Sequence, residues 1–320
     1  MTAHLLDRDG TPQARIDPAT LEGRLHAGEF FWLDLQDPGP DDYALLRDVF
    51  GFHPLPLEDS EHFGQRPKLE DYGEFAFLVL YGAAPPPDED RLVEVHAFYS
   101  ERHLVTVRRD EAPAFEQVRE RYARRPGRSP RPVELLYQLL DALVDSFFPA
   151  LGDLGDRIDV LQDEMLAGPS EEQLQEIFAL RRRLVEVRRT VASQRDLVGR
   201  FVAGDGLPGL DEDARRYFRD VHDHLIRLGD QVDVYREILT GSMDLYLTTV
   251  SNRLNTVMKR LTVIATIALP LVVITGFFGQ NFAVLVDHIG STAAFVGYGV
   301  VLPVAAIAVL AFALRRRGLF

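Results

Sequence analysis

The chain has 320 residues, with 35 Lys and Arg against 49 Asp and Glu, 46% hydrophobic residues and no cysteine. This composition excludes a disordered chain, a collagen-like chain and a disulfide scaffold. The formal charge of −14 argues against nucleic acid as a partner, because the phosphate backbone attracts basic proteins.

The charge is unevenly distributed along the chain. After Met258 the charged residues are Lys259, Arg260, Asp287, Arg315, Arg316 and Arg317. Residues 1–258 therefore carry the whole acidic excess, and the sequence predicts an acidic, water-soluble body joined to a nearly uncharged tail.

Residues 1–130 alternate short strand-like runs with short helical ones. The runs 30–35, 74–82, 92–100 and 103–108 are rich in Val, Phe, Tyr and Leu and are bounded by turn residues, which is typical of strands. Helical spacing occupies 40–50 and 112–124. We therefore expect a cytosolic α/β domain over 1–130, with an exposed acidic loop at 85–90.

Strand signals stop after residue 130, and helical patterns follow. A helical run covers 132–166, and Ser170 with Gln173 forms a capping-box start for a second helix that reaches about residue 202. The Gly-rich segment 203–211 breaks the pattern, and the next proline is Pro270. We expect a cytosolic helical hairpin over 131–210, followed by one long helix over 211–278 whose part 211–260 is a stalk.

Two rows of side chains follow this stalk. The first recurs in steps of four and three, as in a coiled-coil seam, and comprises Val221, Leu225, Leu228, Val232, Tyr235 and Leu239. The second recurs every seven residues and comprises the carboxylates Asp223, Asp230, Glu237 and Asp244. The second row has two open interpretations: a solvated face, or a surface that attracts divalent cations at a subunit boundary.

The tail contains two uncharged runs of membrane-spanning length. Residues 261–278 and 292–314 are joined by the short linker 279–291, and about 18 residues span roughly 27 Å of helix. We expect a transmembrane hairpin, because the alternative, two buried core helices, lacks any amphipathic face to pack.

Basic residues flank both spans and are absent from the linker. Lys259 and Arg260 precede the first span, and Arg315, Arg316 and Arg317 begin the basic tail 315–320. By the positive-inside rule both termini are cytoplasmic, and the N-terminal residues lack the apolar core of a signal peptide. We expect a multi-pass protein of the inner (plasma) membrane in which Lys259, Arg315, Arg316 and Arg317 form a basic ring.

One face of the long helix is polar in the stalk and apolar in the span. Its members are Asp244, Thr248, Ser251, Asn255, Met258, Leu261, Ala265, Leu269, Val272 and Gly276. If this face lines a pore, Asp244 and Asn255 offer oxygens to a hydrated cation, and Met258, Leu269 and Val272 close the path by excluding water. The alternative is a lipid-facing or packing surface.

The sequence resembles the CorA metal-ion transporter family. The segment TGFFGQNF at 275–282 holds a Gly-x-Asn signature at the end of the first span, and HPLPLEDSEHFGQRPKLEDYGEFAFLVL at 53–80 is also similar to that family. The resemblance implies a CorA-like homopentameric funnel with an α/β cytosolic domain, a long stalk helix and a C-terminal two-helix transmembrane hairpin. The first spans then line the pore, and Gly279, Gln280 and Asn281 form an ion selectivity loop whose Asn281 carbonyl groups contact the hydration shell of the ion.

The family also senses intracellular Mg²⁺ through carboxylates between cytosolic domains. Asp220 lies where the stalk could supply one, and we assign Asp220 and Asp223 as regulatory metal ligands, with Asp71 or the Asp88–Asp90 loop as the partner. His222 and His224 are two positions apart and do not share a helix face, which argues against a dedicated site built on both of them.

This chain departs from the common family pattern Tyr-Gly-Met-Asn-Phe at Phe278 and Gln280. The ZntB branch also varies the middle signature residue, so Zn²⁺ stays open as a substrate. His288 in the linker could bind Zn²⁺ or respond to pH, or be solvated only.

These features predict divalent-cation transport by a pentameric channel that is gated by intracellular divalent cation, with Mg²⁺ favoured. The partners are self, membrane lipid and divalent cations, and no cofactor other than the cation is expected. Two alternatives remain: a proton-coupled Zn²⁺ transporter of the ZntB type, and a membrane-anchored acidic metal-sensing scaffold. An enzyme is not expected, because the chain lacks GxxxxGK[ST] and any recognisable hydrolytic set.

Overall fold

The structure is a computed structural model that describes residues 2–6, 12–13, 18–28, 30–85, 91–123, 131–280 and 282–317. The chain divides into two compact units, which are described separately. The first comprises residues 1–164 with 170–243, and the second comprises 165–169 with 244–320.

The first unit contains a seven-stranded sheet in the order β2-β1-β3-β7-β6-β5-β4. The strands are β1 (Thr2–Leu6), β2 (Pro12–Gln13), β3 (Phe31–Gln36), β4 (Lys68–Asp71), β5 (Ala76–Ala83), β6 (Leu92–Tyr99) and β7 (His103–Arg108). The β3–β7 pair is parallel and the other pairs are antiparallel. The four strands predicted from sequence, β3, β5, β6 and β7, are confirmed, whereas β1, β2 and β4 were missed.

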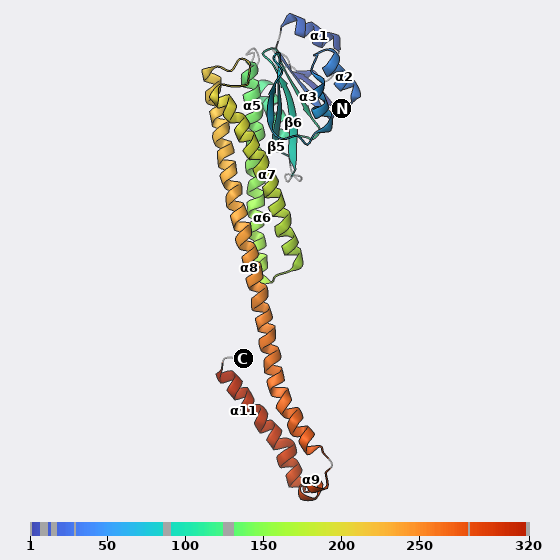
Figure 1. Ribbon diagram of the computed structural model, residues 1–320, viewed down its shortest axis with the longest axis vertical. Coiled ribbons are helices and arrows are strands. Elements are labelled where there is room, and N and C mark those ends of the chain that lie inside the picture. The colour runs from blue at the N-terminus through green and yellow to red at the C-terminus, as the bar shows by residue number, and fades with distance from the viewer. Residues whose placement is uncertain are drawn as a thin grey trace. The chain divides into compact units, whose positions relative to one another are not determined.

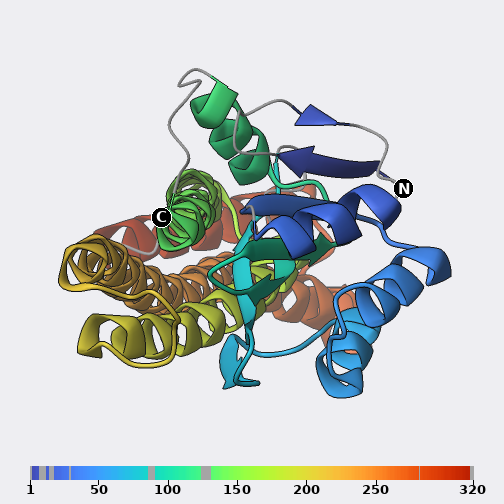
Figure 2. The same cartoon turned by 90° about the horizontal axis from the view of Figure 1, so that it is seen from above.

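Helices cover both faces of this sheet, as Figures 1 and 2 show. One face packs against α1 (Pro18–Ala27), α2 (Pro40–Asp48) and α3 (Pro54–His62), through buried side chains such as Leu21, Leu46 and Leu57. The other face packs against α4 (Pro113–Ala123) and the helices that follow it, through residues such as Phe115 and Leu139. The expected α/β domain is therefore present, with apolar side chains of alternating strand positions buried on both faces.

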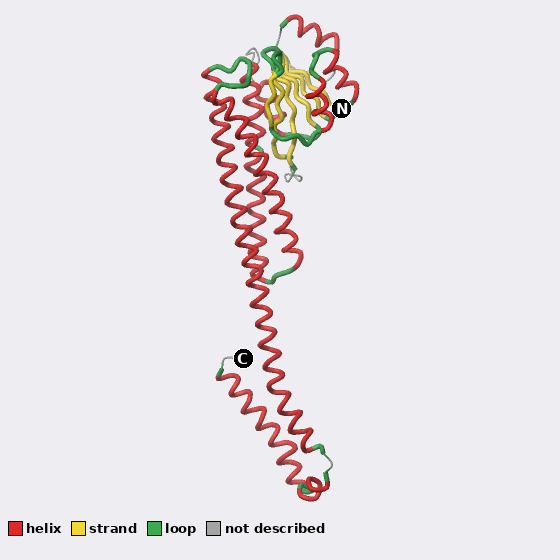
Figure 3. The backbone as a smooth tube through the Cα atoms, viewed as in Figure 1, coloured by secondary structure: helices red, strands yellow, loops and turns green. Residues whose placement is uncertain are grey.

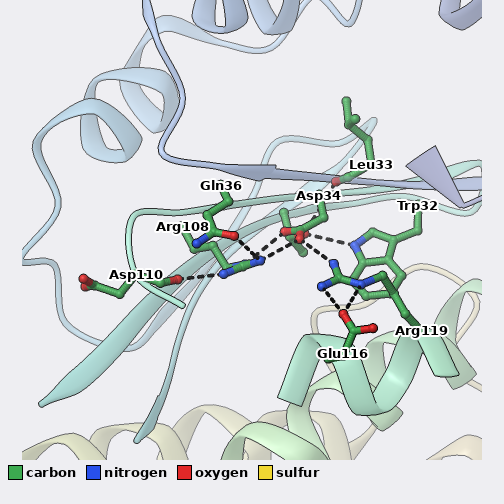
Figure 4. A network of polar contacts seen from close by, with 9 residues as sticks. Trp32, Leu33, Asp34, Gln36, Arg108, Asp110, Glu116 and Arg119 are labelled. Atoms are coloured by element: carbon green, nitrogen blue, oxygen red, sulfur yellow. Dashed lines mark hydrogen bonds and ion pairs between the residues drawn. The ribbon is translucent and has the colours of Figure 1, made fainter. Parts of the chain in front are cut away.

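A buried polar network joins the parallel strand pair to α4 (Figure 4). Asp34 on β3 accepts hydrogen bonds from the Thr106 hydroxyl at 2.9 Å, from Arg108 Nη2 at 3.1 Å and from Arg119 Nη1 at 3.0 Å. The Trp32 indole N–H donates to the Thr106 hydroxyl at 2.9 Å. Asp34 and Arg108 are each 1% exposed, so this charge pair is desolvated and needs its complete set of partners.

The remaining helices of the first unit are α5 (Pro132–Asp145), most of α6 (Phe147–Ala167), α7 (Glu171–Ala203) and the N-terminal part of α8 (Glu212–Phe278). The predicted helical run over 132–166 is confirmed, with a break between α5 and α6 at Ser146. There the Ser146 hydroxyl donates to the Leu143 carbonyl at 2.6 Å and accepts the Ala83 N–H at 2.7 Å. The capping box is confirmed: Ser170 and Gln173 bond each other's backbone N–H at the start of α7.

The outer edge of β5 is covered by helix side chains rather than by another strand. The strand β4 pairs with β5 only from Ala76 to Val79. The backbone groups of Tyr81 that face this edge of the sheet therefore lie past the end of β4. Gln194 on α7 accepts the Tyr81 N–H at 2.7 Å and donates to the Tyr81 carbonyl at 3.1 Å. The fully buried Gln194 amide thus satisfies strand groups that would otherwise be buried without partners.

The predicted apolar seam on α8 is confirmed. Val221, Leu225, Leu228 and Val232 are fully buried, and Tyr235 packs at the border of the same core. The helix α8 continues through Pro270, as the sequence predicts for 211–278. Figure 3 draws it as one unbroken helix.

The second unit holds the end of α8 and the second membrane-length segment. That segment is built from α10 (Thr292–Ala294), the π-helical segment η1 (Phe295–Val301) and α11 (Leu302–Arg316). The predicted helix over 292–314 is therefore confirmed, and π turns occupy part of its first half. Pro303 lacks an N–H for the carbonyl four residues earlier, and wider π turns precede it. The linker also contains a short helix, α9 (Ala283–His288), which was not predicted.

Three helices of the described residues are long and apolar enough to cross a membrane: Pro132–Ala167, Glu212–Phe278 and Thr292–Arg316. In the first helix, 50% of its most apolar 18-residue stretch is buried inside the protein. The corresponding shares are 0% in the second helix and 6% in the third. The first is therefore a core segment, and the other two correspond to the predicted spans.

His103 makes the α/β domain sensitive to acid. Its ring packs against Phe31, Phe50 and Phe52, and burial lowers its pKa from 6.5 to about 4. Because the unfolded chain binds a proton at higher pH than the folded chain does, stability is complete above pH 6.5 and falls as the pH drops towards 4. Lowering the pH from 7.5 to 5 should cost about 2 kcal/mol through this residue.

The single tryptophan, Trp32, is buried in this domain and can report its unfolding by fluorescence in the full chain. Denaturant unfolding at the two pH values should show a smaller pH-dependent loss in His103→Gln than in the unmodified protein. An equal loss in both proteins would contradict the assignment to His103.

Candidate functional site

The predicted ion-path face lies entirely on α8. All ten of its residues, from Asp244 to Gly276, are exposed in the single chain. The apolar members reach high exposure, with Leu269 at 64% and Val272 at 66%. The apolar part of this row, from Met258 to Gly276, must be covered by lipid or by other chains, because it is too apolar to face water.

Threonine hydroxyls along α8 are bonded to the helix backbone. Thr248 donates to the Asp244 carbonyl at 2.8 Å, and Thr262 donates to the Met258 carbonyl at 2.8 Å. The same four-residue step recurs at Thr256, Thr266 and Thr275. These bonds satisfy the hydroxyl protons inside the helix, which lets polar residues continue into an apolar segment.

The signature begins where α8 ends. Gly279 N–H donates to the Thr275 carbonyl at 2.9 Å, and Gln280 N–H donates to the Phe277 carbonyl at 3.3 Å. A Cβ at Gly279 would lie 3.0 Å from the Thr275 oxygen, which is tighter than ordinary contacts, so glycine suits this position by its size. Asn281 lies outside the described residues. Gln280 lines a cavity within the hairpin.

A cluster of possible metal ligands lies between α5 and α8 in the first unit. One ligand atom each from Asp141, Asp145 and His224 lies within 4.8 Å of the others. His224 Nδ1 is 2.9 Å from Asp145 Oδ1, and the Phe148 ring packs edge-on against the imidazole. Two carboxylates and an imidazole suit Mg²⁺ poorly as an inner-shell set on their own, but they suit Zn²⁺, Co²⁺ or a hydrated Mg²⁺.

Asp141 is the electrostatically strained member of this cluster. Its pKa is raised from 3.8 to about 6, chiefly by burial and also by the charges of Asp145 and Asp220, while His224 opposes the shift. A bound divalent cation would relieve this repulsion, which is the chemical basis for a site here.

The structure places only part of the predicted regulatory set near this cluster. Asp220 is exposed one turn before His224 and acts on Asp141 through its charge. Asp223 is exposed and is not a member of the cluster among the described residues. Of the partner candidates, Asp71 accepts the Gly73 N–H in its own turn, and Asp88–Asp90 lie outside the described residues.

Sequence reasoning missed Asp141 and Asp145, although their spacing of four on α5 put both on one helix face. The separation of the two histidines was judged correctly. His224 joins the cluster, whereas His222 faces α7, with Nε2 at 3.7 Å from where a Cβ on Gly199 would lie. The carboxylates Asp223, Asp230, Glu237 and Asp244 are all exposed, which fits either interpretation of that row.

The basic residues predicted to form a ring, Lys259, Arg315, Arg316 and Arg317, are exposed. His288 belongs to α9, and its role stays a prediction.

Asp141→Asn should stabilise the helical part of the first unit near neutral pH. Above pH 6 the substitution removes a charge that its surroundings disfavour. Below pH 6 the wild-type carboxyl is protonated, so the advantage should shrink. After allowance for solvent screening at this half-exposed site, the gain at pH 7.5 should be about 1 kcal/mol.

Thermal unfolding followed by far-UV circular dichroism, at pH 7.5 and 5, measures this difference. Asp153→Asn, an exposed change on α6 outside the cluster, is the matched control. Added Mn²⁺ should raise the unfolding temperature of the wild type more than that of Asp141→Asn, and an equal rise would argue against metal at the cluster.

Comparison with known proteins agrees with this architecture. A sequence model of the family described as CorA-like Mg²⁺ transporter protein matches residues 27–316. The cobalt/magnesium transport protein CorA of Thermotoga maritima is 39% identical over 239 residues, which cover 73% of this chain and 68% of that protein. The zinc transport protein ZntB of Yersinia enterocolitica is 26% identical over 78% of this chain and 76% of its own length.

The fold is that of a full-length relative. The complete structure of the CorA magnesium transporter from Methanocaldococcus jannaschii superimposes with a TM-score of 0.84 at 23% identity, and covers 100% of this chain and 99% of that one. The family match extends over the α/β domain, the long helix and both spans. This chain therefore belongs to the CorA family and is a membrane protein that transports divalent cations, not an enzyme.

Proposed function

We propose that this protein is a homopentameric Mg²⁺ channel closed by divalent cation on its cytosolic side. The observation that carries the proposal is the row of ten exposed residues on α8, from Asp244 to Gly276, which leads to the signature at Gly279. One two-helix hairpin cannot enclose a water path, so a pore must lie on the axis of a closed oligomer. The relatives named CorA support the ion and the fold of the assembled subunit.

The row divides into a polar and an apolar part with different tasks. Asp244, Thr248, Ser251 and Asn255 offer oxygen atoms to a cation that keeps its water shell. Rings of Met258, Leu269 and Val272 then close the path by excluding water when the helices approach one another.

The outer mouth is assigned to Gly279, Gln280 and Asn281. Mg²⁺ gives up water reluctantly, so neutral amide oxygens that hold its outer shell can select it without trapping it. Gln280, where the common family pattern has Met, adds a second amide to each subunit's loop.

The cytosolic gate is assigned to the cluster of Asp141, Asp145 and His224, together with Asp220. When no metal is bound, the charges of Asp145 and Asp220 repel an ionised Asp141 carboxylate. A divalent cation would neutralise this repulsion and hold α8 to α5, and its loss would loosen α8. Intracellular Mg²⁺ would thereby limit its own entry.

The entry of a divalent cation from outside the cell does not require energy from nucleotide hydrolysis. With both termini and the basic residues Lys259 and Arg315–317 on the cytoplasmic side, an inside-negative potential of 100 mV supplies about 4.6 kcal/mol per divalent ion.

Liposomes loaded with a Mg²⁺-sensitive dye test the channel itself. The purified protein should admit Mg²⁺ at a rate that rises with inside-negative potential, and Asn281→Ala should abolish that flux because the amide ring is lost. Asp287→Asn, which changes the other end of the linker, should retain it. Unchanged flux in Asn281→Ala would remove the signature from the mechanism.

The same liposomes test the gate when Mg²⁺ is placed on the side that the cytosolic domain faces. Millimolar Mg²⁺ there should slow wild-type flux of Co²⁺ strongly, whereas Asp141→Asn should need more Mg²⁺ for the same inhibition, because one ligand and its charge are gone. Asp153→Asn should behave as the wild type. Equal inhibition in all three proteins would contradict a gate at this cluster.

A second candidate, proton-coupled Zn²⁺ transport, is favoured by the likeness to ZntB and by Gln280 at the variable signature position. It requires Zn²⁺ flux that stops when the pH gradient is collapsed at constant membrane potential. A metal-sensing scaffold instead requires metal-dependent stabilisation of the first unit with no flux of any divalent ion.

A further inference from the structure

The membrane hairpin contains a cavity next to the proposed signature loop. It has a volume of about 460 Å³ and is lined by the end of α8, by the linker with α9, and by the first half of the second span. A volume of this order is typical of pockets that hold one organic ligand. All of its walls belong to the second unit.

The cavity exists because the two spans are kept apart near the linker. The Phe278 and Tyr298 rings stack across the gap, with centroids 5.2 Å apart. Gly299 leaves its part of the wall without a side chain, and the Phe295 ring lies only 3.6 Å from where its Cβ would be. The π turns of η1 shift these positions relative to a regular α-helix.

The side chains that line the cavity suit a hydrocarbon ligand. Ile274, Leu285, Val286, Ile289 and Pro303 supply aliphatic surface, and none of the described lining residues is an acid or a base. The Thr275 hydroxyl is already bonded to the Leu271 carbonyl at 2.8 Å. A water molecule would find few hydrogen-bond partners in such a cavity, whereas an apolar ligand is stabilised by contact with its walls.

The depth of the cavity corresponds to one leaflet. Pro303, its deepest wall on the second span, lies eleven residues after Thr292, or about 16 Å of helix. The hydrocarbon core is about 30 Å thick, so the cavity extends from the linker end to about the bilayer centre. The surrounding apolar side chains are exposed, Phe295 at 67% and Val273 at 66%, and therefore contact lipid tails or other subunits.

We propose that this cavity binds one acyl chain of a membrane phospholipid between the two spans of each hairpin, directly behind the signature loop. A phospholipid in the leaflet next to the linker can insert a chain from the side, whereas a soluble ligand must first cross the headgroup layer. Tyr298 places a polar atom among the lining residues for the ester end of the lipid. The proposal rests on the chain spanning the membrane and not on which ion it carries.

Photolabelling of the full chain in liposomes tests this assignment, with phosphatidylcholine that carries a diazirine in the middle of one acyl chain. Labels should concentrate in peptides from 274–280 and 294–303. Gly299→Phe should fill the cavity and abolish this concentration, with Ala294→Phe as an independent filling variant. Gly297→Phe is the matched control, because Gly297 lies on the same η1 but does not line the cavity, and labelling should persist.

Labelling spread evenly along both spans, or unchanged by Gly299→Phe and Ala294→Phe, would mean surface lipid only and would overturn the proposal. Because the chain has no cysteine, Tyr298→Cys introduces a single thiol. Disulfide formation between the introduced thiols of two chains, with loss of lipid labelling, would show protein in place of lipid and would also overturn it. Size-exclusion profiles identical to wild type confirm that the filling variants assemble.

Discussion

The burial of one apolar row on α8 is the constraint on which the first unit of this protein depends. Val221, Leu225, Leu228 and Val232 are fully buried, and each such side chain contributes about 1.5–3 kcal/mol. Rotation of α8 would expose all four together, so the helix has one orientation in the first unit. That orientation brings His224 beside α5, where Asp141 and Asp145 lie one turn apart. The grouping of Asp141, Asp145 and His224 is thus a consequence of helix packing.

Polar contacts supplement the apolar packing of the α/β domain by fixing how its helices lie against the sheet. Asp34 joins β3, β7 and α4 through two arginines, and Gln194 on α7 substitutes for a missing strand beside Tyr81. Each contact is buried, so loss of one partner leaves a charge or a backbone group without compensation. Such contacts add less to net stability than the apolar core does. They specify which helix lies against which part of the sheet, and for this reason the sheet and the helices that carry the metal cluster keep a fixed register.

Sequence patterns predicted the parts of this fold that bury long apolar runs. They identified β5, β6 and both spans, because alternation or continuous hydrophobicity extends over enough residues to stand out. They missed β4, in which three of the four residues, Lys68, Glu70 and Asp71, are charged and none is fully buried. They also missed the division at Ser146, where the Ser146 hydroxyl accepts a hydrogen bond from Ala83 in a distant strand. Asp141 was missed for a similar reason. Its spacing from Asp145 is ordinary for a helix surface, and only the packing of α8 reveals that a histidine completes the set.

The hydroxyl bonds along α8 have a consequence for what can pass beside it. A threonine whose proton is held by a carbonyl of the preceding turn turns only its lone pairs outward. Thr248 and Thr262 are in this state, and both are exposed. Their outward surface is therefore electronegative without a formal charge. If the proposed ion path follows this helix, the Thr248 hydroxyl would offer no donor to an anion, while it would offer a hydrated cation a weak acceptor that binds its water briefly, which would favour rapid movement over storage.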